Sequence, residues 1–233
     1  MKVAVIADIH ANLTALQAVL TSCKNKYGPL QYIHLGDCVD YGMRPNEVIA
    51  EIQKLPMLVN IQGNHERAIL GFDNDKFSSA RGLAANNYTK KILTDASINY
   101  LNNMERGVLK IELEEKKILC VHGDMQDIYW GKMQEKEIHQ STYLDYDFVI
   151  SGHTHIPSLR TVIDKENHHR TLFINPGSVG QPRNLNPCAQ YCVLDLELSS
   201  IDFNAVRYDI TTEQDLYNNE VDEYYKARIA FGL

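Results

Sequence analysis

Side chains of the kinds that bind metal ions recur along this chain in five short motifs. Each motif contains carboxylate, amide or imidazole groups, and each directly follows a short apolar run. Oxygen and nitrogen donors without thiolate suit manganese, iron, zinc or cobalt better than a structural zinc site built on cysteine. The residues in chain order are Asp8 and His10 in ADIH, Asp37 in LGDCVD, Asn64 and His65 in GNHE, His122 in CVHGD, and His153 and His155 in SGHTH.

The apolar runs before these motifs indicate buried strands. They comprise residues 3–7, 32–35, 57–61, 118–121 and 148–150, and runs of this kind are typical of parallel or mixed sheets. Open α/β sheets bind their ligands at the carboxyl ends of strands. One such motif is ordinary loop chemistry, but five of them after five strands predict side chains that converge on one point.

The remaining pattern alternates strands and helices, as in an α/β protein. Asn12 and Pro45 predict the starts of two helices, and three hairpins are expected within residues 108–121, 159–174 and 190–208. Residues 66–106 read as a helical decoration over the site, and a charged C-terminal helix is expected from about residue 212. We predict a single domain spanning residues 1–233.

Composition limits the function without deciding it. The formal charge of −7 argues against a general nucleic-acid surface, although it does not exclude a nucleotide substrate. Five cysteines without a CxxC motif fit free thiols in a reducing compartment. No signal peptide or apolar stretch of transmembrane length is present. We therefore expect a cytoplasmic protein without a membrane partner, and its oligomeric state stays open.

The five motifs resemble, in their order, the signatures of the calcineurin-like metallophosphoesterases, and NPGSVGQPR resembles the small prokaryotic branch of that family. The resemblance extends from Val3 to about Leu196. It implies an α/β fold of two facing mixed β-sheets flanked by helices, a four-layer α-β-β-α sandwich. It also implies two divalent ions, with manganese the foremost expectation and iron, zinc, cobalt or nickel as alternatives.

The resemblance also implies a role for each motif residue. Asp37 resembles the carboxylate that bridges the two metals, His65 the catalytic histidine, and Asp40 the residue that orients this histidine. The ligands of the first metal would be Asp8, His10 and His155, and those of the second Asn64, His122 and His153.

This set of groups suits hydrolysis of a phosphate ester. Two ions about 3.5–4 Å apart clamp an in-line displacement and acidify the attacking water, and His65 is placed to protonate the departing oxygen. The predicted function is hydrolysis of phosphomonoesters or phosphodiesters of small molecules, nucleotides among them. One alternative is a serine/threonine protein phosphatase, although Tyr41 replaces the arginine of their GD-x-x-DRG motif. The other is a non-catalytic metal-binding scaffold, which the loss of a ligand would favour.

The substrate contacts are predicted from the loops around the motifs. Arg183 lies in a loop rich in glycine and proline, where a guanidinium could bind phosphate, and Tyr41 and Arg44 belong to a loop that follows the bridging aspartate. Arg183 could equally brace the backbone or form a surface ion pair. Tyr129 and Trp130 could stack on an aryl or nucleobase group, or serve as a hydrophobic anchor for the next helix.

Overall fold

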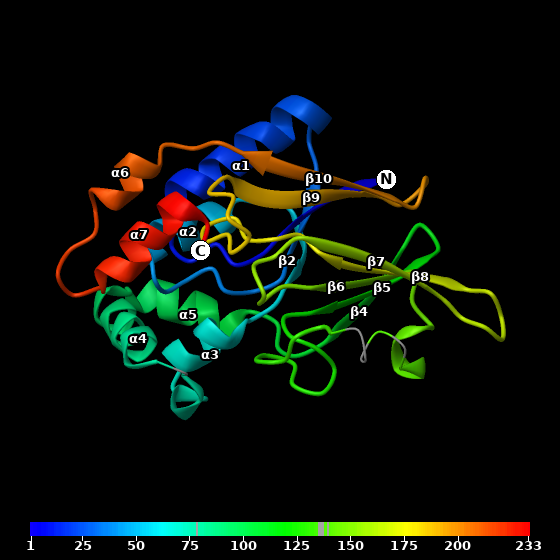
Figure 1. Cartoon of the computed structure of the whole chain (residues 1–233), viewed down its shortest axis with the longest axis horizontal. Coiled ribbons are helices and arrows are strands. Elements are labelled where there is room, and N and C mark those ends of the chain that lie inside the picture. The colour runs from blue at the N-terminus through cyan, green and yellow to red at the C-terminus, as the bar shows by residue number, and fades with distance from the viewer. Residues whose placement is uncertain (78, 135–137, 139) are drawn as a thin grey trace.

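Two mixed five-stranded β-sheets form the centre of the protein (Figure 1). The computed structural model describes the whole chain except residues 78, 135–137 and 139. The first sheet has the order β10-β9-β1-β2-β3, in which β1, β2 and β3 are parallel and β9 and β10 are antiparallel to their neighbours. Its strands are β1 (Lys2–Ile6), β2 (Gln31–His34), β3 (Met57–Asn60), β9 (Ala189–Asp195) and β10 (Ser200–Val206).

The second sheet also contains three parallel strands, but here an antiparallel strand lies at each edge. Its order is β4-β5-β6-β8-β7, and β5, β6 and β8 are the parallel strands. All five predicted strands and all three predicted hairpins are present, and the predicted α/β fold of two facing sheets is confirmed. The strands are β4 (Leu109–Leu113), β5 (Lys116–Val121), β6 (Phe148–Ser151), β7 (Ser158–Ile163) and β8 (Arg170–Asn175).

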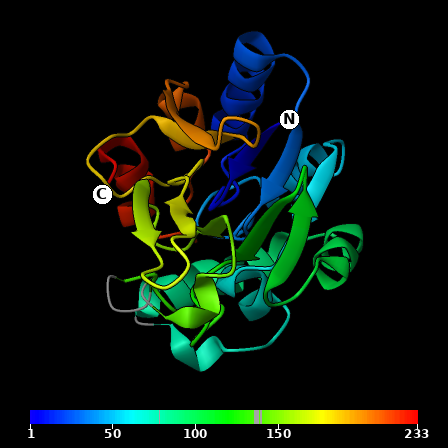
Figure 2. The same cartoon turned by 90° about the vertical axis from the view of Figure 1, so that its right-hand side faces the viewer.

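The two sheets pack face to face through alternate residues of their strands. Val3 and Val5 of β1 lie in a fully buried cluster with Ile118 of β5 and Ile150 of β6. Because successive side chains of a strand point to opposite faces, the alternate residues Ala4 and Ile6 contribute to a different cluster, beneath the helices. Strands that are apolar on both faces therefore produce a layered sandwich. Figure 2 shows the two sheets from the end where the N-terminus lies.

Helices cover the outer face of the first sheet. They include α1 (Leu13–Tyr27) and α2 (Pro45–Ile52), both of which begin where the sequence predicts. The side chain of Asn12 accepts a hydrogen bond from the backbone N–H of Ala15 at 3.0 Å, which satisfies a free donor of the first helical turn. The outer face of the second sheet is covered instead by the chain that follows β5, including Met125, Ile128 and the 3-10 helix η2 (Ser141–Tyr143).

The helical decoration at residues 66–106 comprises three α-helices and a 3-10 turn; residue 78 within it lies outside the described residues. These are α3 (Asn64–Ile69), η1 (Asn74–Lys76), α4 (Ala80–Ile92) and α5 (Asp95–Asn103). The C-terminal region differs from the single helix expected from about residue 212. It forms α6 (Ile210–Gln214) and α7 (Glu223–Phe231), because Asp209 and Asp222 each cap the start of a separate helix.

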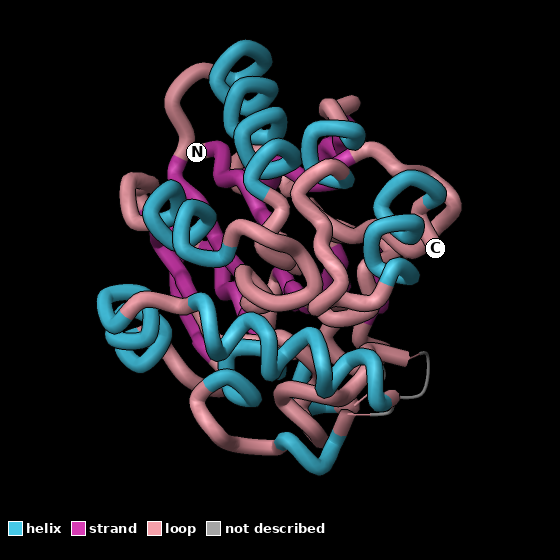
Figure 3. The backbone as a smooth tube through the Cα atoms, turned by 90° about the vertical axis from the view of Figure 1, so that its left-hand side faces the viewer, coloured by secondary structure: helices cyan, strands magenta, loops and turns pink. Residues whose placement is uncertain are grey.

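The carboxyl ends of the six parallel strands lie at the same end of the molecule. Figure 3 views this end, where loops occupy the middle and helices surround them. Two of the loops are joined by backbone hydrogen bonds, from the N–H of Val179 to the carbonyl of Ala7 at 3.0 Å and from that of Gly180 to Asp8 at 3.1 Å. No helix among the described residues is long and apolar enough to cross a membrane.

Gly180 is expected to be the least replaceable glycine at this junction. A Cβ atom there would lie 1.7 Å from the backbone oxygen of Ile9, whereas one at Gly28 would meet nothing within 4 Å. We predict that Gly180→Ala lowers the free energy of unfolding by about 2–3 kcal/mol through overpacking. Thr21→Ala, at an exposed position of α1, should change this free energy by no more than about 0.5 kcal/mol. Equal denaturation midpoints for the two variants would contradict this packing.

Candidate metal centre

Unusual backbone conformations aim the predicted residues at one point. Seven of the fourteen described non-glycine residues with positive φ belong to the predicted site. Such conformations are uncommon for residues that carry a Cβ atom, and they persist where the surrounding structure imposes them, often at functional sites. The seven are Asp8, His10, Asp37, Asp40, Tyr41, His153 and His155.

The first group of ligand atoms comes from Asp8, His10, Asp37 and His155. One atom from each lies within 4.8 Å of those of the others, and all four residues are buried. The Nε2 atoms of His10 and His155 are 3.2 Å apart, and Nε2 of His155 lies 3.3 Å from Oδ1 of Asp8. Four potential donors from the loops after β1, β2 and β6 therefore face a common centre.

The second group comprises Asn64, His122 and His153 together with Asp37. Oδ1 of Asn64 lies 2.9 Å from both Nε2 of His122 and Nδ1 of His153, and Nε2 of His122 lies 3.2 Å from Oδ2 of Asp37. Atoms that bind one ion at about 2.1 Å, at right angles to one another, lie about 3 Å apart. The spacing of this group therefore matches that of a metal coordination shell.

Backbone carbonyls fix the orientation of three of these imidazoles. Nδ1 of His10 lies 3.0 Å from the oxygen of Val39, and Nδ1 of His122 and of His155 lies 2.6 Å from the oxygens of Leu35 and Gln181. A carbonyl oxygen can only accept, so each Nδ1 carries a proton. Nε2 is then left as the electron-pair donor toward the centre, as is usual for histidines that bind metals.

The buried charges of the site suit a bound cation. Burial is the main cause that raises the pKa of Asp8 to about 7, so the protein alone does not fully compensate this carboxylate. Burial also lowers the pKa of His153 to about 3 and holds those of His10 and His155 well below their usual value. These three imidazoles are therefore neutral and able to bind a metal.

Several polar atoms of the site lack partners in the part of the chain that the structure describes. Both carboxylate oxygens of Asp8, Oδ2 of Asp37 and Nδ2 of Asn64 are buried without a hydrogen-bond partner. Buried polar groups are normally paired because leaving them unpaired is costly. Unpaired carboxylate oxygens beside converging imidazoles are suited to bind divalent metal ions. Asp37 belongs to both groups of donors.

Glu66 holds the loop that carries Asp37, a role that the sequence reading missed. Its buried carboxylate accepts hydrogen bonds from the backbone N–H groups of Asp37, Cys38 and Gly63, at 2.7, 2.8 and 2.7 Å. The bond to Gly63 corresponds to half of a capping box at the start of α3. Glutamate three residues after this glycine was a signal for the cap, but not for its contact with the distant Asp37 loop.

His65 lies beside the metal ligands and is oriented as the sequence predicts. Its Nδ1 is 2.7 Å from Oδ2 of Asp40, and Asn86 and Thr89 of α4 donate hydrogen bonds to the same carboxylate at 3.0 and 3.4 Å. Burial alone would lower the pKa of His65, but the charges of Asp37 and Asp40 outweigh it and raise this pKa. A histidine held in this way is suited to donate a proton from Nε2.

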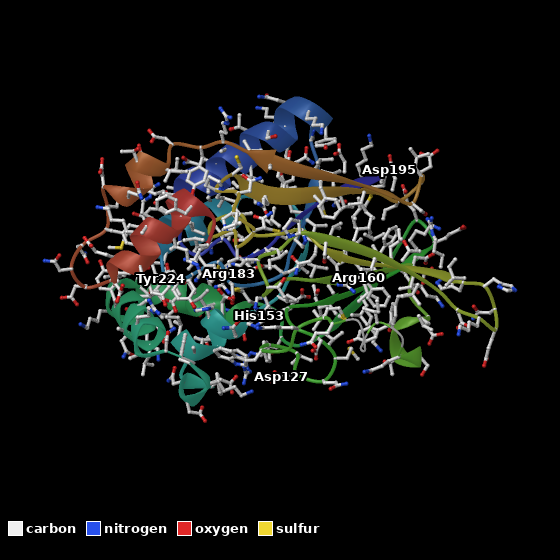
Figure 4. All side chains as sticks on the ribbon, in the orientation of Figure 1. Asp127, His153, Arg160, Arg183, Asp195 and Tyr224 are labelled. Carbon is white, nitrogen blue, oxygen red and sulfur yellow. The ribbon has the colours of Figure 1, made fainter. Side chains whose placement is uncertain are left out.

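A pocket of about 590 Å³ opens over these groups. Tyr41 and Arg183, two of the three predicted substrate contacts, belong to its lining, and Figure 4 shows Arg183 near His153 in the middle of the molecule. The other lining residues are Asp37, Asn64, His65, Lys76, Phe77, Ser79, Trp130, Lys132, His153, Thr154, His155 and Ile156.

Arg44 lies elsewhere and forms a structural contact. Its guanidinium donates hydrogen bonds to the hydroxyl of Thr14, at 2.6 Å, and to the carboxylate of Glu213. Glu213 is buried, so these contacts join the loop before α2 to α1 and α6. Arg44 is not among the pocket residues, and its predicted substrate contact is not carried further.

The C-terminal helix α7 contacts the pocket from behind. Tyr225 stacks on Tyr41, with ring centroids 4.4 Å apart and planes at 19°. The ring of Tyr41 in turn lies 4.5 Å from that of His65 and 4.7 Å from that of His10. A continuous row of rings therefore joins α7 to a candidate ligand and to the candidate acid. The sequence pattern contained no signal for this long-range contact.

Gln181 connects the same helix to Arg183. Its side-chain oxygen accepts hydrogen bonds from Arg183 and from Arg228 of α7, both at 3.4 Å. Its backbone oxygen accepts a hydrogen bond from Nδ1 of His155. Burial and the nearby charge of Arg183 lower the pKa of Arg228 to about 10. Two guanidinium groups on one amide create a positive wall behind the pocket.

Known proteins share both the sequence pattern and this architecture. The calcineurin-like phosphoesterase superfamily domain matches residues 1–199. Protein MJ0912 of Methanocaldococcus jannaschii is 30% identical over 99% of this chain and 98% of its own length. The crystal structure of a metallophosphoesterase from Sphaerobacter thermophilus is 26% identical, with a TM-score of 0.77, and covers 100% of this chain and 99% of its own.

A further solved structure shares the fold alone. Protein PH1004 of Pyrococcus horikoshii has a TM-score of 0.84 at 21% identity and covers 100% of this chain and 98% of its own. Taken with the match over residues 1–199 and the relative that is similar from end to end, the converging ligand groups lead to one conclusion. This chain belongs to the calcineurin-like phosphoesterase superfamily.

Proposed function

We propose that the protein is a metal-dependent hydrolase of phosphomonoesters or phosphodiesters of small molecules. The observation that supports this most strongly is the pair of donor groups that share Asp37. Asp8, His10 and His155 would hold one divalent ion, and Asn64, His122 and His153 the other. When bound, two such ions supply positive charge to the phosphoryl oxygens and acidify the attacking water. Manganese is the expected metal.

The chain's own residues would position the ester and assist its leaving group. Arg183 and Tyr41 line the pocket, and a guanidinium and a phenol hydroxyl can donate hydrogen bonds to phosphoryl oxygens. Tyr41 remains a donor because burial holds its pKa well above the usual value. His65 would give its Nε2 proton to the departing oxygen while Asp40 keeps Nδ1 protonated.

The two alternative functions have less support. A protein phosphatase of this family would use an arginine where Tyr41 stands, and here that position is packed between His65 and Tyr225. A non-catalytic scaffold would not need His65, Asp40 and Asn86 connected in one buried chain of hydrogen bonds. We therefore retain hydrolysis as the function.

Dependence on metal is the first test of this proposal. Because the protein groups alone cannot acidify water enough, chelation should abolish hydrolysis of 4-nitrophenyl phosphate and bis(4-nitrophenyl) phosphate. Adding manganese or another divalent ion should restore it. The measurement is the rate of each ester before stripping, after stripping and after each metal is added. Full activity of rigorously metal-free protein would contradict the mechanism.

The shared position of Asp37 predicts a distinctive metal stoichiometry. Asp37→Asn should weaken both sites, since the bridging charge is lost, whereas His10→Ala and His122→Ala should each weaken mainly one. Elemental analysis of the purified variants, with unfolding midpoints as the control for folding, gives the number of ions bound. Retention of two tightly bound ions and normal turnover in Asp37→Asn would rule out the bridge.

The role of His65 predicts a dependence on the leaving group. His65→Ala should keep both metals yet lose on the order of 10²–10⁴-fold in rate on an alkyl phosphate, which needs a proton on its leaving oxygen. A 4-nitrophenyl ester should lose much less, and Asp40→Asn should behave similarly but more mildly. Since the pKa of His65 is raised, the wild-type rate should fall only above the ordinary histidine range of about 6.5.

The same assays can also contradict the proposed role of His65. Equal losses on alkyl and aryl esters, or loss of metal in His65→Ala, would show that His65 is a ligand or a structural residue. In that case the proton donor would be another group.

A further inference from the structure

The pocket continues beyond the candidate ligands along an aromatic wall. The ring of Phe77 lies 5.6 Å from that of His65 and 5.6 Å from that of Trp130, both in edge-to-face geometry. Trp130 in turn lies 6.3 Å from His153. This wall therefore begins at the proposed proton donor and ends at a candidate ligand of the second metal.

Trp130 has an unused hydrogen-bond donor, whereas its neighbour Tyr129 has a structural role. Within the described part of the chain, the buried Nε1 of Trp130 has no hydrogen-bond partner. The hydroxyl of Tyr129 instead accepts a hydrogen bond from the N–H of Gly107 at 3.0 Å, and its ring lies 4.3 Å from the guanidinium of Arg67. Of the two aromatic residues proposed for stacking, only Trp130 lines the pocket.

Two lysines accompany this wall. Lys76 and Lys132 line the pocket, although the chain as a whole has a formal charge of −7. Lys76 contacts Asp127 at 3.4 Å, but both side chains are more than 40% exposed, and an exposed pair of this kind contributes little. In Figure 4, Asp127 and Arg183 lie on opposite sides of His153. Lys76 thus contacts a residue that in this view lies across His153 from Arg183.

We propose that Phe77, Trp130, Lys76 and Lys132 bind the leaving group of the substrate, and that this group is a planar aromatic ring system carrying its own phosphate. The inference rests on the proposed function, because it takes His65 as the group that faces the departing oxygen. A leaving group that extends from His65 into the pocket can lie against Phe77, which lines the pocket and contacts this histidine. Its ring would then meet Trp130, and its phosphate the two lysines.

Nucleotides are the substrate class that combines a planar aromatic ring system with an additional phosphate. Stacking of a base on an aromatic side chain and a charged hydrogen bond from lysine each increase affinity roughly tenfold or more. The reacting phosphoryl group would occupy the metal side of the pocket beside Arg183. The second phosphate distinguishes this substrate from a simple aryl or sugar phosphate.

Three esters with similar leaving oxygens separate the contribution of the second phosphate from that of the base. These are adenosine 3′,5′-bisphosphate, adenosine 5′-monophosphate and ribose 5-phosphate, assayed with the manganese-loaded protein. The diester series has three corresponding members. The first is 3′,5′-linked diadenosine with a terminal phosphate, the second lacks this phosphate, and the third also lacks one base. In whichever series is hydrolysed, kcat/KM should fall roughly tenfold when the second phosphate is removed. It should fall roughly tenfold again when the base is removed, and KM should change more than kcat.

Variants assign each step to its residues. Lys76→Ala combined with Lys132→Ala should abolish the preference for the second phosphate and leave the preference for the base. Trp130→Ala should do the reverse, and Trp130→Phe should restore most of the preference for the base. Lys165→Ala and Phe231→Ala are matched controls at exposed positions outside the pocket lining, and they should change neither ratio.

The contrary outcomes are distinct from failure of the proposed function. Equal kcat/KM for all members of the hydrolysed series, or ratios unchanged in the variants, would overturn the inference while metal-dependent hydrolysis of 4-nitrophenyl esters remained. Absence of hydrolysis of every ester with every metal would refute the proposed function, and the inference with it.

Discussion

The site is organised around one buried carboxylate, Asp37, that lies between two groups of candidate metal ligands. Asp37 belongs to both groups of donors and is fully buried, where an uncompensated charge would be strongly unfavourable. The fold meets this cost by surrounding the carboxylate with groups that attract a cation or supply hydrogen bonds. Glu66, itself buried, fixes the Asp37 loop through the backbone N–H groups of Asp37, Cys38 and Val39, so one acidic residue organises the position of another.

The two-sheet architecture makes this convergence possible. Three parallel strands in each sheet end at the same side of the molecule. Five of the seven candidate ligands, Asp8, His10, Asp37, His153 and His155, follow these strands at backbone positions with positive φ. The close approach of Gly180 to Ile9 holds the loops after β8 and β1 together. Helices that lie far along the chain then complete the site, since α4 supports Asp40 and α7 supports Tyr41.

Much of this arrangement could be predicted from the sequence because strands and their ends leave local signals. The motifs at Asp8, Asp37 and His122 each follow an apolar run, and the structure brings them together. The contacts of Asn86 and Tyr225 could not be predicted, because helical periodicity does not specify which distant residue a helix face meets. Arg44 shows the same limit, since its sequence context does not reveal the buried glutamate that it contacts.

The proposed mechanism requires Asp37 to bind two metal ions at once. X-ray diffraction at the manganese absorption edge, from crystals of the protein grown with manganese, can locate these ions. We expect two anomalous peaks about 3.5–4 Å apart, with one oxygen of Asp37 within bonding distance of both. A single peak, or two peaks without the Asp37 carboxylate between them, would contradict this mechanism.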